Sequence, residues 1–115
     1  MSDRDDVVFL GHMLDLAHKA VAKVEGVSRE DSDADEDLRM VSAHLIQVIG
    51  EAASRVSEET KLGQPKIPWK EIVGMRHRIV HDSMNVDYDM VWDVLRNKLP
   101  PQIRSLSPLV PSDDG

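Results

Sequence analysis

The side chains best suited to chemistry lie in one short segment, Met75–His81. It places Arg76, His77, Arg78 and His81 close together in an otherwise acidic chain. Arginine is permanently charged and matches the geometry of phosphate, whereas histidine gives or takes a proton near neutral pH. Metal-free cleavage of a phosphodiester needs these two functions, a clamp for the anion and a proton shuttle. The segment is therefore the candidate active site.

Charge is distributed unevenly around this segment. From Lys61 to His81, five lysines and arginines stand against one acid, Glu71, which gives +4 in a chain of formal net charge −7, so the remainder carries −11. The acidic total argues against a general nucleic-acid coat protein. A local basic island on an acidic body suits a focused anion site. For the lysines alone, solvated loop charges are an equally good interpretation.

Length and composition narrow the class of protein. The chain has 115 residues, which predicts one domain over residues 1–107 followed by a flexible tail over 108–115. It has no cysteine, which rules out disulfides and thiolate metal sites and fits a cytoplasmic location. No signal peptide is visible, and no apolar run approaches the roughly 20 residues of a membrane span.

Periodic apolar residues predict helices that position the candidate site. One amphipathic helix is expected over residues 7–24 and ends near Gly26; a second is expected over residues 35–59. The second carries two apolar stripes, so it must bury two faces, one in the core and one against a second chain. Its small residues permit close helix packing; they are Gly50, Ala52, Ala53 and Ser54.

The second half of the chain predicts two more helices. Residues 61–68 are expected to form a loop, and Trp69 begins a helix directly after Pro68. The segment 83–85 ends that helix, and Asp87 caps the next one. Pro100 and the following proline interrupt it before a short C-terminal helix. No alternating strand pattern is long enough to predict a sheet. The fold class is all-α, an up-down bundle of four main helices plus a short C-terminal helix.

The sequence motifs that flank the Arg-x4-His segment resemble those of one known family. Alone, Arg76 and His81 at this spacing are a weak signal, but flanking motifs occur in the same order as in the HepT-like branch of the HEPN superfamily, over roughly residues 5–106. These motifs are Ile49-Gly50-Glu51-Ala52-Ala53, Ile67-Pro68-Trp69, Gly74-Met75, Val91-Trp92 and Leu99-Pro100. The resemblance implies a HEPN-like fold and a cofactor-free endoribonuclease. It further implies the toxin of a type II toxin–antitoxin system, a homodimer paired with an MNT-type nucleotidyltransferase antitoxin.

The resemblance also implies roles for the segment. Arg76 holds the scissile phosphate and His81 transfers a proton, while the ribose 2′-hydroxyl attacks, so the substrate is RNA. In an ideal helix, five steps of about 100° place Arg76 and His81 about 140° apart. Three solutions stay open: His81 lies at a frayed helix end, the arginine bends toward it, or a dimer completes the site. The predicted supporting or substrate-binding residues are His77, Arg78, Glu51 and Asp82.

Several residues have alternative interpretations. The family pattern commonly continues His-x-Tyr, and the partner can add AMP to that tyrosine; here Ser83 stands at this position and Tyr88 lies five residues further on. These two are the candidate modification sites, although Ser83 is equally suited to a turn. His77 and His81 also have the spacing of a helical metal pair, but no metal is expected because no third ligand is obvious.

The large apolar side chains and Glu51 can be explained without a role in the active site. Trp69, Met75 and Trp92 can stack a base but are expected in the core. Glu51 either holds Arg76 or Arg78 in place, or faces solvent. Two other functions compete with ribonuclease activity: a non-catalytic helical partner or regulatory subunit of a small nucleotidyltransferase, and a nucleotide-binding protein that cleaves nothing.

Overall fold

The computed structural model describes the backbone of residues 3–82 and 85–111 and the side chains of residues 5–80 and 85–111. Its α-helices, in chain order, are α1 Asp3–Lys23, α2 Arg29–Ala34, α3 Glu36–Ser54, α4 Glu58–Gly63, α5 Trp69–Ile79, α6 Tyr88–Asp93 and α7 Leu99–Leu106. A π-helical turn, η1 Val94–Lys98, joins α6 to α7, and a 3-10 turn, η2 Ser107–Leu109, follows α7. The only strands of the described chain are β1 Val80–Asp82 and β2 Asn85–Val86.

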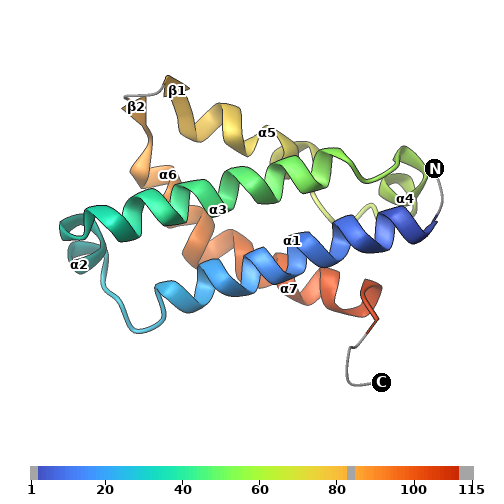
Figure 1. Ribbon diagram of the computed structural model, residues 1–115, viewed down its shortest axis with the longest axis horizontal. Helices are drawn as coiled ribbons and strands as arrows, with labels where there is room; N and C mark the ends of the chain where they lie inside the picture. The colour runs from blue at the N-terminus through green and yellow to red at the C-terminus, as the bar shows by residue number, and fades with distance from the viewer. Residues whose placement is uncertain (1–2, 83–84, 112–115) are drawn as a thin grey trace.

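The long helices run up and down beside one another (Figure 1). α1 and α3 lie antiparallel, α5 lies on the other side of α3, and the segment from α6 to α7 closes the bundle behind them. The interface is filled by fully buried aliphatic side chains from every layer; they include Met13, Ile46, Ile49, Ile72, Leu95, Leu99 and Leu106. The predicted all-α, up-down bundle is therefore confirmed.

Side-chain caps fix where four of the helices begin. The side-chain oxygens of Ser28, Asp35, Ser57 and Asp87 each accept the backbone N–H three residues further on, at 3.0 to 3.3 Å. Each bond satisfies an amide that the first helical turn leaves free. The predicted cap at Asp87 is confirmed. The predicted end of the first helix is confirmed as well, since Gly26 adopts a φ of 74° beyond α1.

A buried carboxylate joins α1 to the start of α4. Asp6 is 3% exposed and accepts hydrogen bonds from the backbone N–H of Ser57, at 2.9 Å, and from the hydroxyls of Ser57 and Thr60. Burial, the largest influence on its pKa, acts to raise it, but these hydrogen bonds outweigh burial and lower the pKa from 3.8. Asp6 therefore remains ionised and fixes the chain direction after α3.

The second apolar face of α3 is only partly covered. The stripe formed by Ile46, Ile49, Ala53 and Val56 is buried in the core. The other stripe lies toward α1 and is half-buried for most of its length, whereas Val41 is 40% exposed and neighbouring Met40 56% exposed. Gly50 lies where α3 and α5 touch, since a Cβ built there would lie 3.0 Å from the carbonyl oxygen of Ile72.

Several boundaries differ from the sequence-based expectation. α3 ends at Ser54, not near residue 59, and the short helices α2 and α4 form where connections were expected. Pro100 and Pro101 occupy the first turn of α7 and do not interrupt the chain's helical path. The N–H of Leu99 donates to the carbonyl of Val94, five residues back, as in a π turn. This wider turn directly precedes Pro100 and Pro101, which have no N–H to donate.

The C-terminal segment is ordered further than predicted. η2 continues the chain from α7, and Leu109 and Val110 pack against the core as half-buried side chains. Val110 lies near Gly11 of α1, at 3.9 Å from the position a Cβ would take there. Leu109 and Val110, which fall within the predicted tail, thus pack against the bundle; residues 112–115 lie outside the described residues.

Candidate active site

The last turn of α5 presents the basic side chains of the motif to solvent. Trp69 anchors the start of α5, because its indole N–H donates to the carbonyl of Gln64 at 3.1 Å and its ring is 8% exposed. Ile72, Met75 and Ile79 continue the buried face. With these positions turned inward, the side chains of Arg76, His77 and Arg78 point outward, and all three are exposed.

Few acidic side chains balance the positive charge of the two motif arginines. Among the described residues, no acid forms an ion pair with Arg76, His77 or Arg78. The C-terminal dipole of α5 favours positive charge at this turn. An anionic ligand can therefore bind at either guanidinium group without displacing an acid of the described chain.

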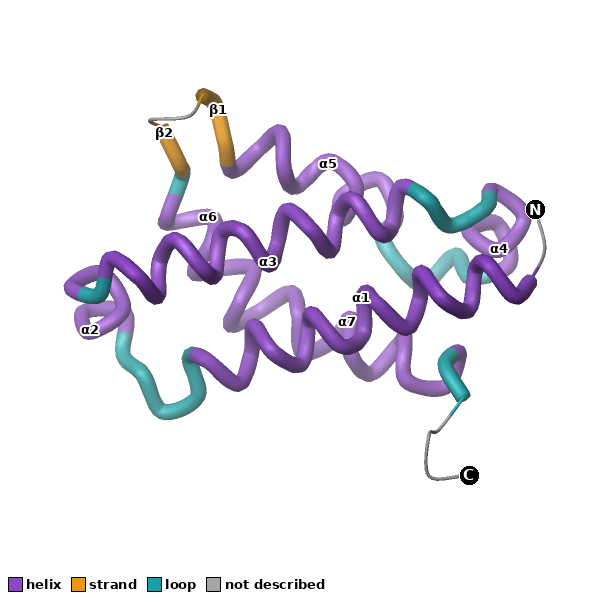
Figure 2. The backbone as a smooth tube through the Cα atoms, in the orientation of Figure 1, coloured by secondary structure: helices purple, strands orange, loops and turns teal. Residues whose placement is uncertain are grey.

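The helix ends sooner than the sequence suggested. Val80 is extended, with φ −121° and ψ 106°, and begins β1. β1 pairs antiparallel with β2, and the N–H of Asp87 donates to the carbonyl of Ile79 at 2.7 Å. This hairpin was not predicted, and it stands at the far end of α5 (Figure 2).

His81 lies at an irregularity of that hairpin. Val80 pairs with Val86 and Asp82 with Asn85, so β1 has one residue more than β2 between the paired positions, and that residue is His81. Bulges of this kind re-aim a side chain and are common beside active sites. Because His81 is not helical, the separation of about 140° expected from five helical steps does not apply.

The same change of backbone affects the helical His77/His81 pair that was considered for a metal. His77 lies on α5 and His81 on β1, so the two do not form a pair one helical turn apart. Among the described residues, no group of three or more His, Asp or Glu side chains could hold a metal ion. The side chains of His81 and Asp82, and all of Ser83, lie outside the described residues.

Two other predicted site residues, Glu51 and Tyr88, contact residues outside the motif. Glu51 is exposed and forms an ion pair with Arg55 one turn further along α3, at 3.5 Å, so it faces solvent and does not hold Arg76 or Arg78. Tyr88 is half-buried in the first turn of α6, where the guanidinium of Arg39 lies 4.9 Å from the centre of its ring.

The large side chains serve the fold. Trp69 and Met75 are buried, as expected for core residues. Trp92 is half-buried and carries the guanidinium of Arg96 over its ring at 5.2 Å. An open groove of about 640 Å³ nevertheless borders the motif; among the residues that line it are Lys61, Leu62, Lys70, Val73 and His77.

Sequence reasoning missed a polar cluster between α5 and α7. Lys98 pairs with Glu71 at 2.8 Å. The hydrogen bond that Lys98 donates to Glu71 is the main cause that raises the pKa of Lys98, while the charge of nearby Arg78 acts against it. Gln102 lies in the same region and is 5% exposed. The available signal was a glutamine on the otherwise apolar stripe of α7 that includes Leu99 and Leu106.

The fold and the site together define a small helical protein with an exposed Arg/His cluster at the end of one helix. The profile of the family described as "Ribonuclease HepT-like" matches residues 13–109. The chain therefore belongs to the HepT-like ribonuclease family. No solved structure matches it significantly.

Similar proteins occur in bacteria and archaea. A Caldanaerobacter subterraneus protein with a provisional RNase name is 32% identical over 92 residues, covering 80% of this chain and 82% of that protein. A Methanocaldococcus jannaschii protein, also provisionally named an RNase, is 26% identical over 100 residues, covering 87% and 92%. The probable ribonuclease HepT of Thermococcus cleftensis is 27% identical over 93 residues, covering 77% and 84%.

Proposed function

We propose that this protein is a metal-independent endoribonuclease that cleaves RNA through Arg76 and His81. The observation that carries the proposal is the juxtaposition at the end of α5: two exposed arginines without acidic partners in the described chain, the exposed His77 between them, and directly afterwards the bulge that holds His81. Membership of a ribonuclease family supports the same chemistry.

Each residue has a defined part in the proposed reaction. The 2′-oxygen of a ribose attacks the adjacent phosphorus, the bond from phosphorus to the 5′-oxygen of the next nucleotide breaks, and a 2′,3′-cyclic phosphate remains. The guanidinium of Arg76 stabilises the charge that grows on the phosphoryl oxygens. His81 transfers the proton between the 2′-hydroxyl and the leaving 5′-oxygen. DNA has no 2′-hydroxyl and is therefore not a substrate.

Substitutions at the two residues test this chemistry. We expect His81→Ala to lower the cleavage rate by about 10²–10⁴-fold and Arg76→Ala by about 10²–10³-fold. Arg76→Lys should restore little activity, because lysine lacks the planar fork. Matched controls are His18→Ala on α1 and Arg104→Ala on α7, both exposed and remote in sequence from the motif.

The assay follows cleavage of labelled RNAs of mixed sequence in excess EDTA, with DNA of the same sequence alongside. Persistent cleavage of RNA alone, lost in His81→Ala and kept in His18→Ala, supports the proposal. Intact RNA with wild-type protein, or equal rates for His81→Ala and wild type, would contradict it. A helical, non-catalytic partner of a nucleotidyltransferase would then describe the chain better.

The cellular role extends this proposal. We propose that the protein acts in the cytoplasm as the toxin of a type II toxin–antitoxin system, with an MNT-type nucleotidyltransferase as its antitoxin; this rests on the family resemblance. Expression should arrest growth, and co-expression with the partner should relieve it. Any adduct that the partner adds should appear by mass spectrometry on Ser83 or Tyr88. No helix in the described residues is long and apolar enough to cross a membrane.

A homodimer is also part of the proposal. Met40 and Val41 expose apolar surface on the outer side of α3, where a second copy would cover them. The angle between Arg76 and His81 in an ideal helix does not support a dimer, because His81 is not helical. A monomer by analytical ultracentrifugation at micromolar concentration would contradict this assignment.

A further inference from the structure

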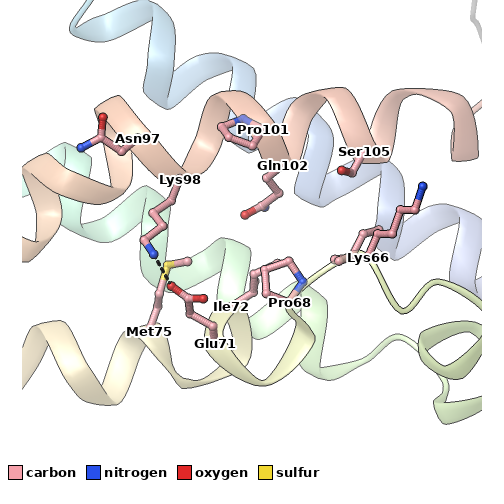
Figure 3. A pocket seen from close by; sticks show the side chains of 11 residues that line it. Lys66, Pro68, Glu71, Ile72, Met75, Asn97, Lys98, Pro101, Gln102 and Ser105 are labelled. Carbon is pink, nitrogen blue, oxygen red and sulfur yellow. Dashed lines mark ion pairs between the residues drawn. The ribbon is translucent and has the colours of Figure 1, made fainter.

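A cavity separates α5 from η1 and α7 on the side of the motif helix that the proposed chemistry does not use. Its volume is about 190 Å³. Ile67, Pro68, Ile72, Met75 and Pro101 give it apolar walls, and Figure 3 shows these walls contributed from both sides of the gap. The cavity therefore offers apolar surface to a flat or compact group rather than an open, solvated face.

One polar side chain in this cavity lacks a partner. Gln102 is 5% exposed, and its Nε2 makes no hydrogen bond to any described residue. Figure 3 shows the amide reaching from α7 into the gap toward α5. Buried polar groups almost always have partners, because an unmet donor loses its hydration without compensation. An amide held in this way points to a ligand with a hydrogen-bond acceptor.

The ends of the cavity are polar. At one end Lys98 of η1 pairs with Glu71 of α5 at 2.8 Å, as the dashed line in Figure 3 marks. Lys66 lines the cavity as well, and no acid of the described chain forms an ion pair with it. Asn97 and Lys98 belong to the π turn, a feature that occurs frequently at functional sites.

The cavity lies beside the motif on the same helix. Glu71, Met75 and Arg78 are spaced four and three residues apart on α5, so they share one face. Arg78 follows Met75 by about 4.5 Å along the axis. It is also close enough to Lys98 for its charge to act on that amine. A chain of phosphates held at Arg76 and Arg78 would therefore pass the mouth of the cavity.

We propose that this cavity binds a nucleobase of the RNA strand, next to the phosphate held by the motif; the inference rests on the proposed function. Bases combine flat apolar faces with edges that carry acceptors and donors, which matches apolar walls around a single free amide. Glutamine amides recognise base edges elsewhere, most often adenine. Gln102 would read the base edge, Pro68 and Pro101 would contact its faces, and Lys66 would bind a flanking phosphate.

Binding of RNA that cannot be cleaved tests the cavity independently of catalysis. The probes are fluorescent 2′-O-methyl hexanucleotides of A, C, G and U, and binding to the full-length protein is followed by anisotropy. We expect one base to be preferred, and Gln102→Leu to weaken binding of that hexamer by about two- to tenfold and to reduce the preference. Lys66→Ala should weaken all four hexamers alike, because it removes a phosphate contact.

Control variants separate recognition from folding. Gln102→Leu conserves volume and removes an unmet donor, so its thermal unfolding temperature should equal or exceed that of the wild type. Gln47→Leu removes a half-buried glutamine of α3 whose amide donates to its own helix, at the carbonyl of Ala43, and it should bind RNA like the wild type.

The outcomes distinguish the cavity from the cleavage mechanism. If wild-type protein cuts RNA but Gln102→Leu binds all four hexamers as the wild type does, the base pocket is wrong and the ribonuclease stands. If RNA is not cut but base preference depends on Gln102, the base pocket is supported and the catalytic assignment is contradicted. If no hexamer binds at millimolar concentration, the pocket is wrong for RNA, and a protein side chain becomes its better occupant.

Discussion

A close contact between α3 and α5 gives a sharp test of how the fold positions α5. Gly50 of α3 lies so near α5 that an added Cβ would meet the carbonyl oxygen of Ile72 at 3.0 Å and that of Val73 at 3.6 Å. Both atoms belong to the backbone of α5, so they cannot rotate aside as a flexible side chain would. We predict that Gly50→Ala pushes α5 away from α3.

Two opposing effects set the size of the change. Replacing a glycine inside a helix by alanine stabilises the fold by about 0.5–1 kcal/mol, because the unfolded chain loses freedom. Overpacking a tight contact costs about 1–3 kcal/mol. The net effect of Gly50→Ala is therefore a loss of about 0–2.5 kcal/mol in the free energy of unfolding. Gly50→Val, with a branched and larger side chain, should lose more.

The chain provides a matched control in the facing helix. Gly74 lies inside α5, and a Cβ added there would meet nothing within 4 Å. Gly74→Ala should therefore show the helix gain alone, about 0.5–1 kcal/mol. Urea unfolding followed by circular dichroism gives both values, and thermal midpoints should differ by about 4 °C for each kcal/mol. If Gly50→Ala stabilises as much as Gly74→Ala, the close approach of α3 and α5 does not constrain the motif helix.

Two further predictions concern side chains that fix the ends of helices. Asp6→Asn should lower the free energy of unfolding by about 1–3 kcal/mol at pH 7. Because the folded pKa of Asp6 is lowered, its contribution is present above the unfolded pKa and is lost as the pH falls below about 4 through the folded pKa. Urea titrations should thus show wild type and Asp6→Asn converging at low pH, and a constant difference would refute this role. Asp87→Ala removes the cap of α6, the bond from the N–H of Met90 at 3.1 Å, and should cost about 1 kcal/mol; an unchanged urea midpoint would contradict it.

Much of the fold could be predicted because the relevant signals are local or periodic. The spacing of Leu10 and Ala17 on α1, and of Ile46, Ile49 and Ala53 on α3, matches the faces that are buried. Caps and positive-φ glycines act within a few residues, so the cap of α6 and the end of α1 were accessible too. The short helices α2 and α4 were missed because they have only six residues each and little apolar content.

The end of α5 could not be predicted from its own residues. Ile79 and Val80 continue an apolar helical pattern, and nothing local requires the helix to stop between them. The stop depends on pairing with residues further along the chain, in β2, and on the N–H of Asp87 reaching the carbonyl of Ile79. Gln102 was likewise unpredictable as a site residue, since only packing against α5 shows which groups surround it.

The position of the basic residues explains how an acidic protein can bind RNA. A body that carries −11 outside the segment from Lys61 to His81 repels phosphate over most of its surface. Within the segment, Lys61 is partly compensated by Glu58 at 4.0 Å, whereas Arg76 and Arg78 have no acidic partner in the described chain. The most favourable place for a phosphate is then the last turn of α5. Because few charges attract the strand there, recognition must come from contacts beside the motif, which is where the cavity with Gln102 lies.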